Sequence, residues 1–453
     1  MYRTVIRSLI NLAANKLLLI LLLGLSFRFL LGLYAGDHAA TYVKITLLEE
    51  LFHGGVPILR ATSFGTSFYI FYIPVYFVYD FLRVFLSIDI AFFLNFLFKL
   101  PPILGDLITV YALYHISLSF TTSKKARNIA AFYFLNPYVI WMSSIVGHAE
   151  QLMMAFLLLA ILFLIQKKII LASGSLALLV SFRHFPILVI PVILIYIWKT
   201  VASSASQTIR FLTIFIGLVT ILATPYLYSI FVIYQTSPDA AWAFFDHWLG
   251  IRGGVGNVLE YSIAEISLLE YNFTGVFASL GIWETIKGFF GLRAYLVYFT
   301  FITIFFLYFF KKGSINWINN YIIVIFSTFI LIIPLAQHHY MMWVFPFMLL
   351  GAYIFRSIPK YFPLVLSFSV LGTDIFAGGS FVYWLDATFP KFFGLFPERL
   401  SNWLFFDYPF ATSISIICAI TLLLSIIFNL SFIRHQSHDK IPTEKNSRDV
   451  SHG

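Results

Sequence analysis

Long apolar runs, separated by short polar segments, make up most of this chain. Many runs stay unbroken over about 17–25 residues, the length that an α-helix needs to cross the hydrocarbon core of a bilayer. They do not alternate apolar and polar residues, as the strands of a membrane barrel would. Because a backbone in lipid must satisfy its own hydrogen bonds, the pattern predicts an all-α, polytopic transmembrane helical bundle of about 13–14 spans.

The first part of the chain contains both clear and ambiguous segments. One span is expected over residues 17–34, followed by a polar outer loop over residues 36–66. Within this loop, residues 41–52 have apolar side chains at helical spacing, which predicts a short amphipathic helix on the membrane surface. Residues 67–120 are expected to contain two or three spans. Later spans are expected near residues 128–144, 150–166, 169–182, 185–198, 209–233, 294–310, 318–335, 339–355, 361–377 and 410–433.

Basic residues recur in every second connection, as the positive-inside rule requires of cytoplasmic loops. Arg3, Arg7 and Lys16 favour a cytoplasmic N-terminus, and Lys124 and Lys125 lie in a further cytoplasmic loop. An even number of membrane crossings must separate the N-terminus from this loop. We therefore expect span one plus three short or tilted segments within residues 67–120. Two crossings with an outside N-terminus are the alternative. Residues 1–433 form one bundle, and residues 434–453 form a hydrophilic, disordered cytoplasmic tail.

The composition excludes a soluble globular domain. Apolar residues make up 60% of the chain and charged residues 11%, and the mean hydropathy is +0.90. Basic cytoplasmic loops account for the net charge of +9, so no nucleic-acid partner is implied. The one cysteine, Cys418, excludes an intrachain disulfide.

Rare charged and histidine side chains gather at span ends on the opposite, outer face of the bundle. The topology that places them there follows from the basic loops alone, so their convergence is an independent observation. Convergent polar groups at the head of a helical bundle predict a functional site. The set comprises Asp37, His38, Lys99, His148, Glu150, Arg183, His184, His338 and His339, with Asp106 deeper in the membrane.

These residues also have plain structural interpretations. A carboxylate at the end of a span, such as Asp37, is solvated without having any function. The pair Arg183 and His184 suits either a phosphate or the headgroup of an ordinary lipid. Asp106 lies about 10 Å into a span, at about 1.5 Å per residue, and faces either a substrate cavity or a structural basic partner. The adjacent histidines at 338 and 339 point to different helix faces, so we expect no metal site.

Short motifs at these positions resemble the GT-C class of integral-membrane glycosyltransferases, which includes dolichol-phosphate-mannose enzymes of GPI assembly. The chain departs from that class in having no Asp-x-Asp in the first loop, and in having His-His-Tyr where glucosyltransferases have His-x-His-Glu. The resembling stretches are Gly36-Asp37, Gly54-Gly55-Val56-Pro57, Lys99-Leu100-Pro101-Pro102 with Gly105-Asp106, Asn136-Pro137, Gly147-His148-Ala149-Glu150, Arg183-His184-Phe185-Pro186 and Gln337-His338-His339-Tyr340.

The resemblance implies a glycosyltransferase, most simply a mannosyltransferase, with an outward or lumenal site. Its donor would be a polyprenyl- or dolichol-phosphate sugar, its acceptor lipid-linked or a glycan, and no cofactor or metal would be obligatory. Asp37 would be the catalytic base, and the sugar would transfer with inversion. The donor phosphate would contact Lys99, Arg183, His184, His338 and His339. The substrate pocket would contain His38, Asp106, His148 and Glu150.

Two other functional classes stay open. A secondary transporter or flippase for lipid-linked saccharides would show inverted repeats or broken spans at the midplane. A structural membrane subunit would tolerate alanine at Asp37. The membrane is either the plasma membrane of a prokaryote or that of the endoplasmic reticulum, where the Asn272-Phe273-Thr274 sequon on an outer loop could be used.

Overall fold

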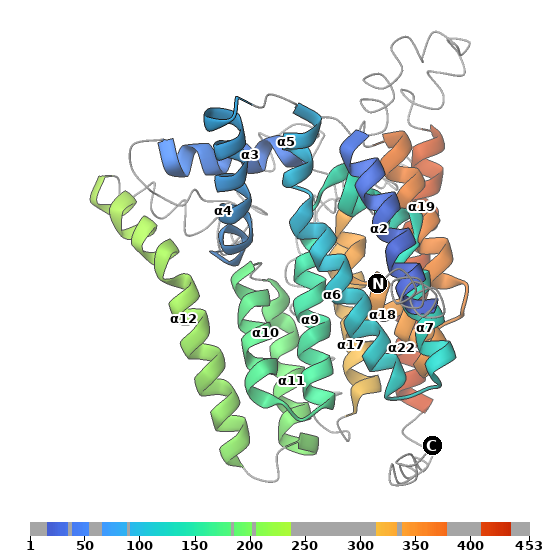
Figure 1. Ribbon diagram of the computed structural model, residues 1–453. Helices are drawn as coiled ribbons and strands as arrows, with labels where there is room; N and C mark the ends of the chain where they lie inside the picture. The colour runs from blue at the N-terminus through green and yellow to red at the C-terminus, as the bar shows by residue number, and fades with distance from the viewer. Residues whose placement is uncertain are drawn as a thin grey trace, which may run out of the picture.

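The computed structural model describes residues 16–34, 39–53, 66–87, 91–182, 185–201, 205–236, 314–332, 338–377 and 409–435. Every regular element in these ranges is a helix, and the long helices pack side by side as a bundle (Figure 1). This confirms the prediction of an all-α, polytopic helical bundle.

The helices in the first half of the chain build the part that holds the site. They are α2 (Lys16–Tyr34), α3 (Ala39–His53), α4 (Thr66–Asp80) continued by the π-helix η1 (Phe81–Phe85), α5 (Ala91–Leu97), α6 (Leu100–Leu118), α7 (Ser123–Phe134), α8 (Pro137–Ile140), the π-helix η2 (Trp141–Val146), α9 (Glu150–Ile165), α10 (Ile169–Phe182), the 3-10 helix η3 (Phe185–Val189), α11 (Ile190–Tyr196), the π-helix η4 (Ile197–Val201) and α12 (Ala205–Thr236).

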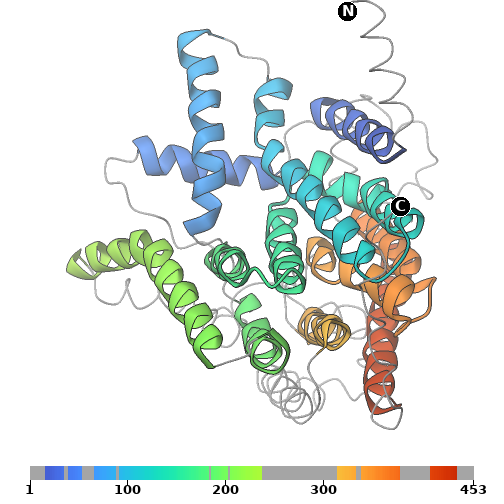
Figure 2. The ribbon, with the colours of Figure 1, turned by 60° about the horizontal axis from the view of Figure 1, so that its bottom comes forward.

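The helices of the second half pack against this part. They are α17 (Ile315–Ile332), the 3-10 helix η6 (His338–Trp343), α18 (Phe345–Leu350), the π-helix η7 (Gly351–Phe355), α19 (Phe362–Ala377) and α22 (Pro409–His435). Helix α22 packs against α17 and α19. In both views, α12 and α22 lie at opposite edges of the bundle (Figures 1 and 2).

Within the described ranges, four helices are long and apolar enough to cross a membrane, and a bent pair makes up to five. Seven further apolar helices are 10–17 residues long. The chain is therefore built as a multi-pass membrane protein, while the count of 13–14 spans stays a prediction.

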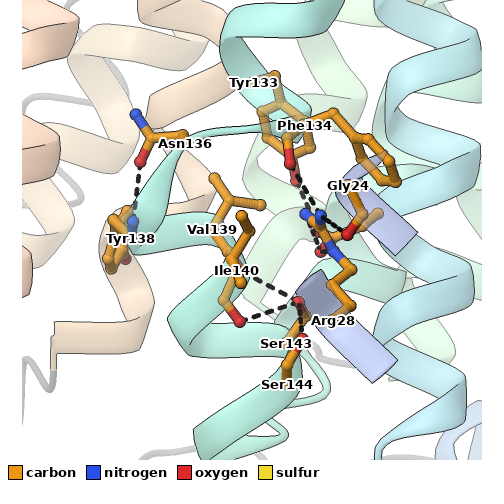
Figure 3. Close-up of polar contacts among 11 residues, drawn as sticks. Gly24, Arg28, Tyr133, Phe134, Asn136, Tyr138, Val139, Ile140, Ser143 and Ser144 are labelled. Carbon is orange, nitrogen blue, oxygen red and sulfur yellow. Dashed lines mark hydrogen bonds and ion pairs between the residues drawn. The ribbon is translucent and has the colours of Figure 1, made fainter. Parts of the chain in front are cut away.

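One predicted span is broken in the structure. The run expected at residues 128–144 divides into α7 and the α8–η2 segment, which meet at an angle of 49°. Pro137 begins α8, where its missing N–H is tolerated, and Asn136 Oδ1 accepts a hydrogen bond of 3.0 Å from Tyr138 N (Figure 3). The Asn-Pro pair therefore ends one helix and caps the next.

The prediction of three spans within residues 67–120 is also wrong. The structure has two long helical segments there, Thr66–Phe85 and Phe93–Leu118. At the Lys-Leu-Pro-Pro stretch, a turn at residues 98–99 joins α5 to α6 within one span-length segment. Pro101 and Pro102 fall in the first turn of α6, where prolines are tolerated. The predicted surface helix at residues 41–52 is present as α3, which lies across the direction of the bundle helices (Figure 1).

Helices α2 and α6 run in opposite directions. Lys99 Nζ, just before α6, donates a hydrogen bond of 3.2 Å to the Gly32 carbonyl near the end of α2. Asp106, further along α6, pairs with Arg28, which comes earlier in α2. The start of α2 therefore lies at the same end of the bundle as the basic segment after α6, in agreement with the positive-inside rule. We call the opposite end, where α2 ends and α6 begins, the outer end.

Helices α6 and α9 run in parallel and approach closely. A Cβ atom added to Gly105 would lie 2.6 Å from Gln151 C and from Leu152 N, so only glycine allows this approach. Gly105, the sixth residue of α6, is thus level with Gln151 in the first turn of α9, and both helices run inward from the outer end.

Candidate functional site

A buried ion pair lies below the outer end. Arg28 of α2 and Asp106 of α6 are both fully buried, and Arg28 Nη2 lies 2.9 Å from Asp106 Oδ2. Tyr133 of α7 donates a hydrogen bond of 3.1 Å to Asp106 Oδ1. Arg28 Nη1 also donates to the carbonyls of Gly24 and Phe134, at 3.2 and 2.8 Å (Figure 3). Arg28 Nε donates a hydrogen bond of 2.9 Å to Asp106 Oδ2. These contacts join three helices and pair the two opposite charges, which makes the pair a structural element.

A second group of polar side chains lies at the outer end itself. It consists of Lys44 from α3, Tyr72 from α4, Lys99 before α6, and His148 and Glu150 at the start of α9. We call these five residues the lysine cluster. Lys44, Tyr72, Lys99 and Glu150 are buried, at 2%, 0%, 0% and 0% exposure. Four separate helical segments therefore bring ionisable groups together at one place.

Backbone carbonyls position the two lysines. Lys44 Nζ donates a hydrogen bond to the carbonyl of Gly147, and it lies 5.3 Å from the centroid of the Tyr72 ring. Lys99 Nζ donates to the Gly32 carbonyl of α2. Gly147 ends η2 in a left-handed conformation, with φ of 71°, which a residue without Cβ adopts at no cost. The turn between η2 and α9 thus presents its carbonyl to Lys44.

The acidic and imidazole groups of the cluster come from the first turn of α9. His148 Nδ1 lies 3.6 Å from Glu150 Oε2, and the His148 side chain is 17% exposed while Glu150 is fully buried. A carboxylate in the first turn of a helix is stabilised by the helix dipole. His148 is therefore the member of the cluster that reaches the surface.

Burial sets the charge state of Lys44. It lowers the pKa of Lys44 from 10.5 to about 7, because taking an ammonium group out of water disfavours its charged form. The Glu150 carboxylate opposes this change and the Lys99 ammonium adds to it. Lys44 is thus poised to gain a proton when a further negative charge arrives.

The structure brings three of the residues predicted from sequence into this cluster: Lys99, His148 and Glu150. Asp106 instead lies in the ion pair with Arg28, the structural position that the sequence left open. Asp37, His38, Arg183 and His184 lie outside the described residues. The backbone of His338 and His339 forms the start of η6, and their side chains are not among those described. Within the described ranges, no three metal-ligating side chains gather.

Sequence reasoning missed Lys44 and Tyr72. Lys44 is the only basic residue between His38 and His53, in a segment of apolar character. A surface helix usually extends its lysines into water, so this residue gave no reason to expect burial. Tyr72 is one of many aromatic residues in its run and carried no separate signal.

Residues 70–258 of the chain match the sequence profile of the GPI transamidase subunit PIG-U. This range runs from α4 through α12 and contains every member of the lysine cluster except Lys44. Among curated proteins, sequence comparison finds no match. The chain is thus similar, over less than half its length, to a subunit of a membrane enzyme of GPI metabolism.

The match overturns the function predicted from sequence. A GPI transamidase attaches proteins to GPI anchors, so its subunit conflicts with a mannosyltransferase that uses a polyprenyl-phosphate donor. The transporter or flippase has no support either. The prediction was wrong because the motifs behind it are short, and because a bundle with polar groups at one end hosts many functions.

Proposed function

We propose that this chain is a membrane subunit of a GPI transamidase complex in the endoplasmic reticulum, and that it binds the lipid-linked GPI rather than carrying out the transfer. The observation that carries the proposal is the match to the PIG-U subunit over residues 70–258. The lysine cluster supplies the place where a charged lipid headgroup would be recognised, at the end of the bundle that the basic loops assign to the lumen.

The chemistry of the cluster suits binding better than acyl transfer. Transamidation needs an activated nucleophile that first accepts the acyl group. The cluster offers ammonium, imidazole, carboxylate and phenol groups, which recognise charge and donate hydrogen bonds. The one thiol of the chain, Cys418, is buried in α22, where attack on a protein substrate is blocked. We therefore assign the nucleophile to another subunit of the complex.

Purification of the tagged, full-length chain from its own cells in mild detergent tests the assignment to a complex. We expect the other transamidase subunits to co-purify in stoichiometric amounts. A chain that purifies alone, from cells in which the transamidase is intact, would contradict the proposal.

Depletion of the chain tests the reaction. If attachment of proteins fails, complete GPI accumulates and GPI-anchored proteins disappear from the cell surface. Accumulation of GPI precursors with shortened glycans would instead show a defect in glycan assembly and would overturn the proposal.

A further inference from the structure

We propose that the continuous helix formed by α4 and η1 does not cross the membrane, although it is long and apolar enough to do so. We call it the α4–η1 helix. It is re-entrant: the chain enters and leaves it from the outer side, and acyl chains of the outer leaflet cover its exposed face. This placement follows from the packing of the described helices and is independent of the proposed function.

The first argument is the number of crossings. Lys16, at the start of α2, and Lys124 and Lys125, at the start of α7, belong to basic segments at the inner end of the bundle. Between these basic segments the structure has three helical segments of spanning length, Lys16–Leu33, Thr66–Phe85 and Phe93–Leu118. Only an even number of crossings returns the chain to the side on which it began, so one of the three does not cross.

The positions of α2 and α6 identify the segment that does not cross. Lys99 Nζ donates a hydrogen bond of 3.2 Å to the Gly32 carbonyl, which joins the end of α2 to the start of α6. Arg28 and Asp106 pair further along the same two helices. Helix α2 therefore crosses outward and α6 crosses inward, so the α4–η1 helix, which lies between them in the sequence, makes no crossing.

The α4–η1 helix runs outward from a level inside the bundle. The Phe71 ring lies 5.5 Å from the ring of Phe156, which is two turns into α9. Further along, the Tyr79 ring lies 5.4 Å from the ring of Phe98, just before the start of α6. In Figure 1 the α4 ribbon accordingly continues beyond the upper ends of α9 and α10. The first part of the helix thus lies within the depth of the bundle, and η1 lies at its outer end.

Lipid surrounds the bundle as far out as this level. Leu30 and Leu33, near the end of α2, are exposed on a helix that crosses the membrane. Gly32 lies between them and accepts the hydrogen bond from Lys99. Because exposed leucines of a spanning helix face acyl chains, the hydrocarbon extends outward to the level of Gly32. The part of α4 that precedes Tyr79 therefore lies within the outer leaflet, and η1 lies at the surface of that leaflet.

The exposed face of the α4–η1 helix is a continuous apolar stripe. Phe77, Val78, Phe81, Val84 and Phe85 are between 49% and 74% exposed, and their spacing places them along one side of a helix. None of these side chains donates or accepts a hydrogen bond, whereas an interface with another protein carries polar contacts throughout. A helix with such a stripe lies with its apolar face among acyl chains.

The charged groups of the helix lie away from the stripe, toward α3. Asp80 and Arg83 are the two charged residues of the segment. Arg83 Nη1 donates a hydrogen bond of 3.0 Å to Glu49 of α3, and Arg83 Nη2 lies 3.8 Å from Asp80 Oδ1. All three side chains are partly exposed. Paired charges at the level where the helix leaves the acyl region are placed as the headgroup layer requires.

The inner end of the helix satisfies a further condition. Helix ends at membrane depth are tolerated where protein buries them, because their free N–H groups cannot face lipid. Thr66, Ser67 and Phe68, in the first turn of α4, are all buried. The Phe68 ring lies 6.2 Å from the ring of Phe182, at the end of α10. The turn that enters the leaflet is therefore covered by protein, and the exposed stripe begins beyond it.

This placement has a consequence for the lysine cluster. Tyr72 of the cluster is part of α4, and Lys44 of α3 lies against its ring. The re-entrant helix thus holds the cluster beside the outer leaflet, from which a lipid-linked substrate would arrive. This consequence rests on the proposed function, whereas the membrane placement does not.

Labelling of single cysteines tests the topology in sealed vesicles of the cell's own membranes. In a Cys418→Ser chain, His53→Cys marks the end of α3 and Ser87→Cys follows η1; both positions are exposed. Lys124→Cys, at an exposed lysine of α7, marks the inner side. We expect an impermeant maleimide to modify His53→Cys and Ser87→Cys from one and the same side, opposite to Lys124→Cys. Modification of His53→Cys and Ser87→Cys from opposite sides would show that the helix crosses and would overturn the proposal, as would modification of both from the side of Lys124→Cys.

Fluorescence quenching tests what covers the stripe. A bimane label is attached at Val78→Cys, and at Leu30→Cys of α2 as the matched lipid-facing control, in the full-length chain with its co-purifying subunits in nanodiscs. We expect lipids that carry a nitroxide near the headgroup to quench both labels and iodide in the water to quench neither. The unfolding midpoint of each labelled chain checks that it is folded. Quenching of the Val78→Cys label by iodide alone would place the stripe in water, and protection from both quenchers would show that protein covers it; either result would overturn the proposal. Because neither test requires the transamidase, a chain that purifies alone would refute the proposed function and leave this inference standing.

Discussion

The buried pair of Arg28 and Asp106 gives the sharpest prediction about stability. Asp106→Asn keeps the shape of the side chain but removes its charge, and leaves the Arg28 guanidinium buried without a counter-ion. Both side chains are fully buried at a separation of 2.9 Å. Breaking such a pair by removing one partner costs about 3–5 kcal/mol. We expect Asp106→Asn to lower the free energy of unfolding by this amount.

The double variant Arg28→Met/Asp106→Leu distinguishes the cost of an unpaired charge from the value of the pair. Because an apolar replacement of both partners is often neutral, the double variant should recover most of the loss. Unfolding is followed by circular dichroism in mixed micelles of dodecylmaltoside and SDS, and reaction of Cys418 with a thiol dye gives a second signal because this thiol is buried. Ser26→Ala, at an exposed position of α2, is the control. A loss below about 1 kcal/mol in Asp106→Asn, the scale of an exposed pair, would refute this account of the pair.

Three further predictions concern the outer end. Gly105→Ala should cost about 1–3 kcal/mol of stability, because its Cβ would lie 2.6 Å from the backbone of α9; Gly217→Ala, with no atom within 4 Å of the new Cβ, should cost nothing in the same unfolding assay. Gly147→Ala should cost about 1–2 kcal/mol because of its φ of 71°, whereas an unchanged unfolding midpoint would show that the turn relaxes. Between pH 7 and 10.5, the unfolded state binds more protons at Lys44 than the folded state does, so stability should rise with pH across this window. In Lys44→Met, the unfolding midpoint should rise less with pH across this window than in the wild type. Identical pH profiles for the variant and the wild type would contradict the lowered pKa of Lys44.

The fold class could be predicted from the sequence because few backbone structures satisfy their hydrogen bonds in lipid. Apolar runs of spanning length must form helices, and alternating basic loops set their direction, so the bundle, the surface helix α3 and the shared end of Lys99, His148 and Glu150 could all be expected. The breaks were harder to predict. The Asn136-Pro137 pair bends a run that reads as one span, whereas Pro101 and Pro102 begin a helix without interrupting it, because their positions fall in its first turn.

The partners of the buried charges could not be predicted from the sequence. Arg28 and Asp106 are 78 positions apart, and their pairing depends on the antiparallel packing of α2 and α6. Lys44 donates its hydrogen bond to the carbonyl of Gly147, which is 103 positions away in the sequence. Hydrophobic pattern determines which segments lie in the membrane, but it does not determine which side chains meet across helices. The function predicted from the sequence was wrong for the same reason, since short polar motifs indicate where a site lies but do not determine its reaction.

The most direct test of the account is made in cells whose only copy of this chain is the Lys44→Met/Lys99→Met variant, beside cells with Lys124→Gln. We predict that the variant still co-purifies with the transamidase subunits, that GPI-anchored proteins are lost from the surface, and that complete GPI accumulates, while the Lys124→Gln cells stay normal. Normal anchoring of proteins in the double variant, or accumulation of shortened GPI precursors, would contradict the account.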